Sequence, residues 1–271
     1  MAFKLPENKP QIPKDTPRNF FFYGETMSGK SYLANEFPAP IVLNTDGNAE
    51  ANTVPSIQLV NEKDEQGRIT KSVISQIGEI LLALQTQKHT YKTVVVDVID
   101  DVIEMIKIAV CDELTPAGKP RLKSLSEIPY GKGYDFFNQA ITEMVIDLKA
   151  LPMNVIYISR QVSEYDDNGN ATKDKPSLKD KYVNLINGNS DLMIHTEKVG
   201  NNYNREVERK RKKYYMDQVD DKEILKILST IRGALEPAKA PSKPAPAKKE
   251  EAKKEAPKPQ KKETVSEDDL F

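Results

Sequence analysis

The residues with the clearest chemical role lie between Asn19 and Ser31. Gly24, Gly29, Lys30 and Ser31 follow the spacing G-x-x-x-x-G-K-S. Glycine lets a loop backbone approach phosphate oxygens closely, and the N–H groups of such a loop donate hydrogen bonds to them. Lys30 would bring a positive charge to the β- and γ-phosphates, and the Ser31 hydroxyl would be a ligand for Mg²⁺. The spacing therefore predicts a P-loop that binds a nucleoside triphosphate.

An apolar run precedes this loop and a helix-like segment follows it. Phe20 to Tyr23 is a run of four aromatic residues, as expected of a strand buried on both faces, and Tyr32 to Phe37 is the helix-like segment. Strand, glycine-bounded loop and helix form the context in which the motif indicates a P-loop, with the helix start facing the phosphates. We expect the whole loop to contact the nucleotide: Gly24, Glu25, Thr26, Met27, Ser28, Gly29, Lys30, Ser31 and Tyr32.

A second Mg²⁺ ligand is predicted at Asp97. Thr93 to Val96 is the strongest strand pattern of the chain, and Asp97 follows it directly. A P-loop needs a carboxylate at the end of a neighbouring strand to help hold the metal, whereas the alternative is an aspartate that only caps the strand end. The P-loop upstream favours a metal site made of Ser31 and Asp97. Asp100 and Asp101 are predicted as the cap and first turn of the next helix.

Three further polar residues are candidates for catalysis. Asp46 and Glu50 follow the second predicted strand and would orient or activate water for hydrolysis, but a turn or cap role stays equally open for both. Ser159, Arg160 and Gln161 end another predicted strand, where a polar side chain can sense the γ-phosphate. Gln161 is the favoured candidate there, with a solvated strand end as the alternative.

The predicted core contains one dense basic cluster: Arg209, Lys210, Arg211, Lys212 and Lys213. It would contact a nucleic-acid backbone, or reach the nucleotide of a neighbouring subunit as an arginine finger. An ordinary solvated charged segment is the third interpretation. Tyr214 and Tyr215 follow directly and either stack on bases or belong to the core.

Composition limits the function classes. The chain has 271 residues and a net charge of −1, so no overall positive field attracts nucleic acid. No apolar run approaches the ~20 residues that cross a bilayer, and the first 17 residues do not resemble a signal peptide. A single cysteine, Cys111, excludes an internal disulfide, fits a reducing cytosol and is expected in the core.

The hydrophobic pattern predicts an α/β fold in three parts. Residues 1–18 read as an extended arm, 19–236 as the core, and 237–271, which are mostly Pro, Ala, Lys and Glu, as a disordered tail. Alternating strands and helices favour a mainly parallel sheet with helices on both faces. Strands are predicted at 20–23, 41–44, 56–60, 93–96, 154–159, 191–195 and 213–216, and helices at 32–37, 73–85, 102–110, 134–148 and 221–235.

Taken together, these motifs resemble those of phage-encoded AAA-type ATPases with a RecA-like core, a group that includes single-strand annealing recombinases. The resemblance covers about Arg18 to Leu235 and rests on four stretches: Tyr23 to Ser31, Val42 to Gly47, Tyr91 to Asp97, and Tyr130-Gly131 before Phe136. It implies a RecA-like P-loop NTPase fold, ATP and Mg²⁺ as cofactors, single-stranded DNA as a partner, and assembly into a homo-oligomeric ring or filament.

The resemblance also carries expectations about individual residues. Asp46 stands where RecA-like enzymes commonly have glutamate, and a shorter acid predicts slow hydrolysis. By position, Tyr130 to Tyr134 is the expected DNA-contact loop. The end of the chain, with Asp268, Asp269, Leu270 and Phe271, is similar to the C-terminal tip of bacterial single-stranded-DNA-binding proteins. That likeness implies docking to a replication or recombination protein.

Three functions are compatible with these features. The first is an ATP-hydrolysing phage recombination protein that binds single-stranded DNA and promotes annealing or strand pairing in the cytoplasm of an infected bacterium. The second is a nucleotide-switched adaptor that binds ATP with little turnover and recruits replication proteins through its tip. A small-molecule kinase is less favoured, because no arginine-rich lid is recognisable.

Overall fold

The computed structural model of the chain describes residues 16–47 and 53–238. The predicted arm, apart from residues 16–18, and all of the tail beyond residue 238 lie outside the described residues, as do Glu50 and the four residues of the C-terminal tip. No helix in these two ranges is long and apolar enough to cross a membrane.

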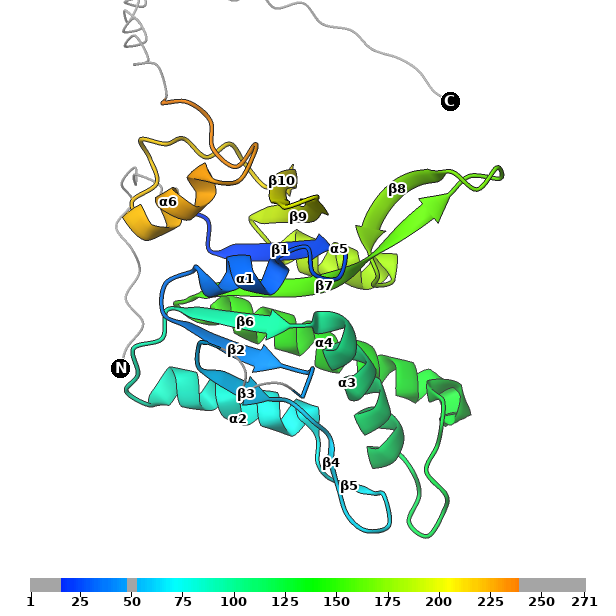
Figure 1. Ribbon diagram of the computed structural model, residues 1–271. Helices are drawn as coiled ribbons and strands as arrows, with labels where there is room; N and C mark the ends of the chain where they lie inside the picture. The colour runs from blue at the N-terminus through cyan, green and yellow to red at the C-terminus, as the bar shows by residue number, and fades with distance from the viewer. Residues whose placement is uncertain (1–15, 48–52, 239–271) are drawn as a thin grey trace, which may run out of the picture. The chain divides into compact units, whose positions relative to one another are not determined.

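A mainly parallel sheet forms the centre of the core (Figure 1). Six parallel strands lie in the spatial order β9 (Leu192–Val199), β1 (Asn19–Gly24), β7 (Asn154–Tyr165), β6 (Thr93–Asp97), β2 (Pro40–Asn44) and β3 (Ser56–Gln58). Two strands are antiparallel to their neighbours, β10 (Asn202–Lys210) beside β9 and β8 (Ala171–Pro176) beside β7. A separate small hairpin joins β4 (Glu62–Lys63) and β5 (Ile69–Lys71). The predicted α/β class with a mainly parallel sheet is confirmed.

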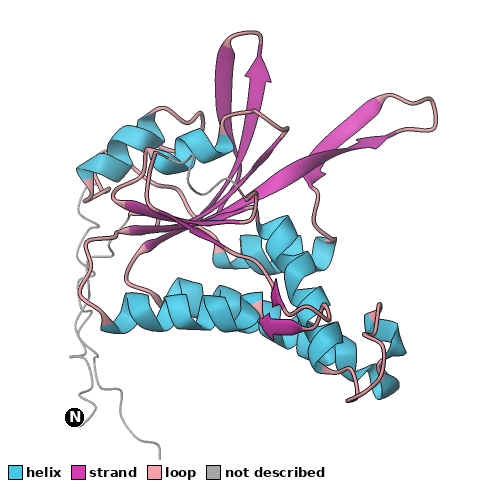
Figure 2. Ribbon diagram, turned by 60° about the horizontal axis from the view of Figure 1, so that its bottom comes forward, coloured by secondary structure: helices cyan, strands magenta, loops and turns pink. Residues whose placement is uncertain are grey.

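Helices cover both faces of this sheet (Figure 2). On one face lie α1 (Lys30–Asn35) and α6 (Lys222–Ser229), which share a buried cluster with Phe20 and Phe22. The other face is covered by α2 (Val73–Thr86), α3 (Ile99–Glu113), α4 (Lys132–Ala150) and α5 (Asp180–Asn189). Two short 3₁₀ turns, Leu125–Glu127 and Pro129–Gly131, precede α4. Both sides of β1 are thus buried, which explains its unbroken aromatic run.

The α1 side of the core is built on aromatic packing around β1. Phe20 and Phe37 meet edge to face with ring centroids 4.9 Å apart, and Phe22 lies 6.0 Å from Phe37. Edge-to-face pairs of buried rings add to the free energy of burial. Phe37, two residues beyond the end of α1, thereby holds α1 and the loop before it against β1.

The carboxyl ends of the parallel strands meet at one edge of the sheet. Gly24 at the end of β1 lies opposite Arg160 of β7 on one side and Thr196 of β9 on the other. Strand alternation decides which way the nearby side chains point. Val95, Ile158 and Ile194 belong to the cluster that contains α1, and Asp97, Arg160 and Thr196 each follow one of them by two residues. Alternation therefore directs all three side chains toward the α1 face, and the guanidinium of Arg160 reaches from there to Asp101 in the first turn of α3.

Most predicted elements appear within a few residues of their expected bounds, and the exceptions are two predicted elements and three that the pattern missed. The predicted strand at 213–216 is wrong, because Tyr214 is a buried core residue and Tyr215 forms only an isolated bridge with Glu236. The predicted helix at 221–235 ends at Ser229. The hydrophobic pattern did not reveal α5 or the two antiparallel strands β8 and β10, which are largely polar. Cys111 is buried in α3, as expected.

Candidate functional site

The loop between β1 and α1 has the conformation that its glycines allow. A Cβ atom at Gly24 would lie 2.1 Å from the carbonyl oxygen of Thr196, so only glycine fits there. Gly29 has φ +87°, in the left-handed region that favours glycine, and the exposed Met27 has φ +64°. Ser28 and Thr196 share a hydrogen bond between their hydroxyls at 2.7 Å, which ties the loop to β9.

Lys30 lies inside this loop and is only 8% exposed. Its ammonium donates hydrogen bonds to the carbonyl oxygens of Gly24 at 2.8 Å and Glu25 at 2.6 Å. Burial lowers the pKa of Lys30, and the negative charges of Asp97 and Asp100 oppose that shift. The loop thus holds a desolvated cation next to its own backbone, which is an arrangement suited to an anionic ligand.

The first residues of α1 face the end of β6. The Ser31 hydroxyl donates a hydrogen bond to Oδ2 of Asp97 at 2.5 Å. Burial raises the pKa of Asp97, while the hydrogen bond from Ser31 partly offsets the effect. The structure therefore places side by side the two residues predicted to hold Mg²⁺. Mg²⁺ in such sites binds one or two carboxylates together with substrate phosphates, so this oxygen pair fits the ion.

Comparison with protein families agrees with this geometry. A family model described as an AAA domain matches residues 16–222, from just before β1 to the start of α6. The chain belongs to the AAA domain family. A search of curated proteins found no match. The family consists of nucleotide-binding P-loop ATPases, which is the class of protein that the P-loop motif indicates.

Arg160, which follows Ser159 at the end of the same predicted strand as Gln161, lies near the P-loop of this AAA domain. Its guanidinium binds both carboxylate oxygens of Asp101, each at 2.7 Å, and Asp101 in turn accepts a hydrogen bond from Thr45. The charge of Arg160 also acts on Lys30 and on Asp97. Because Ile158 faces α1, alternation alone would have indicated that Arg160, two residues later, faces the P-loop.

Gln161 is not brought to the P-loop of the AAA domain. It lies on the opposite face of the sheet, where its Oε1 atom is 2.7 Å from Nε2 of His195. His195 stacks on Tyr23 with ring centroids 4.8 Å apart. These contacts give Gln161 a structural partner, and strand alternation directs it away from the phosphate side.

Of the two candidate catalytic carboxylates after β2, Asp46 and Glu50, the structure describes only Asp46. Asp46 is exposed, its backbone N–H donates to Oδ1 of Asn44, and its negative charge raises the pKa of Asp97. It therefore lies near Asp97, while its catalytic role stays a prediction. Glu50 lies outside the described residues. Asp100 and Asp101 are in the first turn of α3, whose cap is Val98.

The basic cluster lies at the other end of the sheet from the P-loop. Lys210 is opposite Leu192 at the amino end of β9, and it pairs with Glu236 at 2.5 Å. Arg211 lies 3.5 Å from Asp191 and donates to the carbonyl oxygen of Gly188 at 2.6 Å. The cluster therefore cannot act on the P-loop of its own chain, so contact with DNA or a neighbouring subunit stays a prediction.

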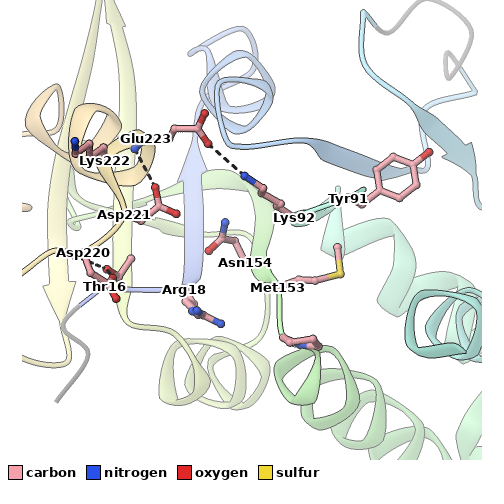
Figure 3. A pocket seen from close by; sticks show the side chains of 11 residues that line it. Thr16, Arg18, Tyr91, Lys92, Met153, Asn154, Asp220, Asp221, Lys222 and Glu223 are labelled. Carbon is pink, nitrogen blue, oxygen red and sulfur yellow. Dashed lines mark hydrogen bonds and ion pairs between the residues drawn. The ribbon is translucent and has the colours of Figure 1, made fainter. Parts of the chain in front are cut away.

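Two cavities lie at separate places around the sheet. One, of about 480 Å³, is at the amino edge between Arg18, Lys92, Asn154 and the start of α6, and no P-loop residue lines it (Figure 3). The other, of about 520 Å³, is bordered by Arg160. Its further lining includes three aromatic and two basic side chains: Tyr134, Phe137, Tyr182, Lys107 and Lys179. The second cavity adjoins the nucleotide site through Arg160.

Proposed function

We propose that this AAA domain protein binds ATP with Mg²⁺, hydrolyses it slowly, binds single-stranded DNA and promotes annealing or strand pairing. The contact of Ser31 with Asp97, at the mouth of a loop that buries Lys30, carries the nucleotide part of the proposal. Ser31 and Asp97 would hold Mg²⁺, and Lys30 would bind phosphate oxygens. The bound ion would neutralise charge that develops on the phosphates during hydrolysis.

The DNA part is supported by exposed aromatic residues before and within α4. Tyr130 is 94% exposed at φ +58°, and Tyr134 is half-exposed at the cavity that Arg160 borders. Aromatic rings of this kind stack on unpaired bases. Arg160 would connect the two activities, because it borders the aromatic cavity and its charge acts on Lys30 and Asp97. DNA bound at Tyr130 and Tyr134 would thereby influence hydrolysis.

The remaining parts of the proposal come from the sequence resemblance. The protein would act in the cytoplasm of a phage-infected bacterium and assemble into a ring or filament on DNA. In such an assembly the basic cluster at residues 209–213 would contact DNA or a neighbouring subunit. The tip at residues 268–271 would dock a replication or recombination protein.

The test compares ATP hydrolysis and strand annealing with and without single-stranded DNA. We expect DNA to stimulate hydrolysis by the wild-type protein. Tyr130→Ala should lose about 10-fold in DNA affinity, since stacking contributes ~1–3 kcal/mol per base, and should keep its basal hydrolysis. Tyr165→Ala removes a similarly exposed tyrosine from the β7–β8 hairpin and should behave as wild type.

Two results would contradict the proposal in different ways. An unchanged rate of ATP hydrolysis on addition of single-stranded DNA, together with no strand annealing, would exclude the recombination role. Tight ATP binding without turnover, in the presence or absence of DNA, would favour the nucleotide-switched adaptor instead.

A further inference from the structure

The side chain of Tyr203 lies against the P-loop from a distant part of the chain. A Cβ atom built at Gly29 would be 2.9 Å from Cδ1 of the Tyr203 ring, so the ring packs on the glycine itself. The residue is 51% exposed, and the ammonium of Lys198 lies 5.4 Å from the ring centroid. An aromatic surface is therefore available next to the loop that precedes Lys30.

The position of this ring is fixed by the strand that carries it. Along β10, Val207 packs against the core cluster that contains α1, and Arg205 pairs with Glu36 at the end of α1 at 3.1 Å. Tyr203 is the next residue on the same face and reaches the start of α1. The strand thus follows α1 from one end to the other, which holds the ring at Gly29.

Tyr203 and the metal-binding pair lie on opposite sides of the P-loop. In the sheet, β9 and β10 are on one side of β1, whereas β7 and β6, with Asp97, are on the other. A nucleotide whose terminal phosphates and metal are at Ser31 and Asp97 has its nucleoside directed away from β6. Tyr203 provides an exposed ring at that end of the site.

We infer that the nucleotide base stacks on the ring of Tyr203, which makes the β9–β10 hairpin the nucleoside-binding part of the site. This inference rests on the proposed binding of ATP by the P-loop. Stacking of a base on an aromatic side chain contributes ~1–3 kcal/mol. Lys198 holds the ring from within the hairpin through a cation–π contact. Tyr203 therefore contributes to affinity for the nucleoside, and the P-loop contributes to affinity for the phosphates.

Calorimetric titrations with ATP and with inorganic tripolyphosphate, both with Mg²⁺, separate these contributions. Wild type should bind both ligands. Tyr203→Ala should weaken ATP binding by about 10-fold, the lower part of the range for one stacked base, and leave tripolyphosphate binding unchanged. Tyr203→Phe keeps the ring and should bind ATP as wild type does. Tyr165→Ala, an exposed tyrosine in the other hairpin, is the matched control and should change neither titration.

A second readout uses the absence of tryptophan from the sequence. Tyr203→Trp introduces a single tryptophan, whose emission should change with ATP and stay constant with tripolyphosphate. Unchanged ATP affinity in Tyr203→Ala would overturn the inference while leaving the P-loop intact. Equal weakening for both ligands would also overturn it, since Tyr203 would then only support the loop. A wild-type protein that binds neither ligand would overturn the proposed function as well.

Discussion

Asp97 is a partly buried carboxylate, and its ionised form is disfavoured by the fold but would be stabilised by a divalent cation. Burial raises its pKa above the usual aspartate value, and the Ser31 hydrogen bond reduces that shift only in part. Just above the unfolded-state pKa, the folded protein therefore holds a proton at Asp97 that the unfolded chain has released. The contribution of Asp97 to folding stability therefore falls as the pH rises from its unfolded-state pKa to its folded-state pKa. The ionised carboxylate destabilises the metal-free fold at neutral pH.

Asp97→Asn should consequently have opposite effects on stability and on metal-dependent binding. In EDTA at pH 7 we expect a higher Tm than wild type, because the desolvated charge is gone. The gain in ATP affinity that Mg²⁺ gives wild type should fall by at least ~10-fold. Thermal denaturation and ATP titrations, each with Mg²⁺ and with EDTA, measure the two effects.

The raised pKa of Asp97 also predicts how the effect of Mg²⁺ on ATP affinity depends on pH. Mg²⁺ binds the ionised carboxylate, so in wild type the benefit of Mg²⁺ should decline as pH falls through the raised pKa of Asp97. Asp147→Asn, at an exposed position in α4, is the control and should alter neither measurement. A full Mg²⁺ effect in Asp97→Asn would remove Asp97 from the metal site.

At the scale of elements, the P-loop depends on how closely β1 approaches β9. Gly24 leaves no room for a side chain, because the atom it would meet is the backbone carbonyl of Thr196. A backbone atom cannot rotate away as a side chain can, so an added methyl group must shift a strand. Gly78 in α2 offers the contrast, since a Cβ there meets nothing within 4 Å and the residue is inside a helix.

Gly24→Ala should destabilise the fold by about 1–3 kcal/mol, the usual cost of overpacking. Gly78→Ala should stabilise it by roughly 0.5–1 kcal/mol, since alanine loses less backbone entropy in a helix. Denaturant unfolding of both variants measures these changes. Equal stability of Gly24→Ala and wild type would show that β1 and β9 can separate at no cost.

Some of these strands could be predicted from the sequence alone, and others could not. β1, β2 and β6 are apolar runs ended by polar residues, and such buried strands have a local signal. β10 has none, because alternating charges such as Arg205 and Glu206 suit an edge strand that is held by its pairing with β9. Gln161 pairs with His195 and Arg160 pairs with Asp101, and strand alternation, which is visible in the sequence, separates these two neighbours.

At the scale of the whole molecule, the candidate site is assembled from strands that are distant in sequence. The P-loop motif and Asp97 are each predictable from the residues beside them. Thr196 contacts Ser28 across 168 residues, and Tyr203 reaches Gly29 from a polar strand. These contacts follow from β9 lying next to β1, with β7 inserted between β1 and β6. That order is a long-range property of the sheet, so no local pattern indicates it.

Titration of ATP into the Lys30→Ala protein tests the central claim, that the loop from Gly24 to Ser31 binds the phosphates. Lys88→Ala, at an exposed position after α2, serves as the matched control. The account predicts measurable binding of ATP with Mg²⁺ by wild type and by Lys88→Ala, and none by a folded Lys30→Ala protein. Unchanged ATP affinity in Lys30→Ala would contradict it.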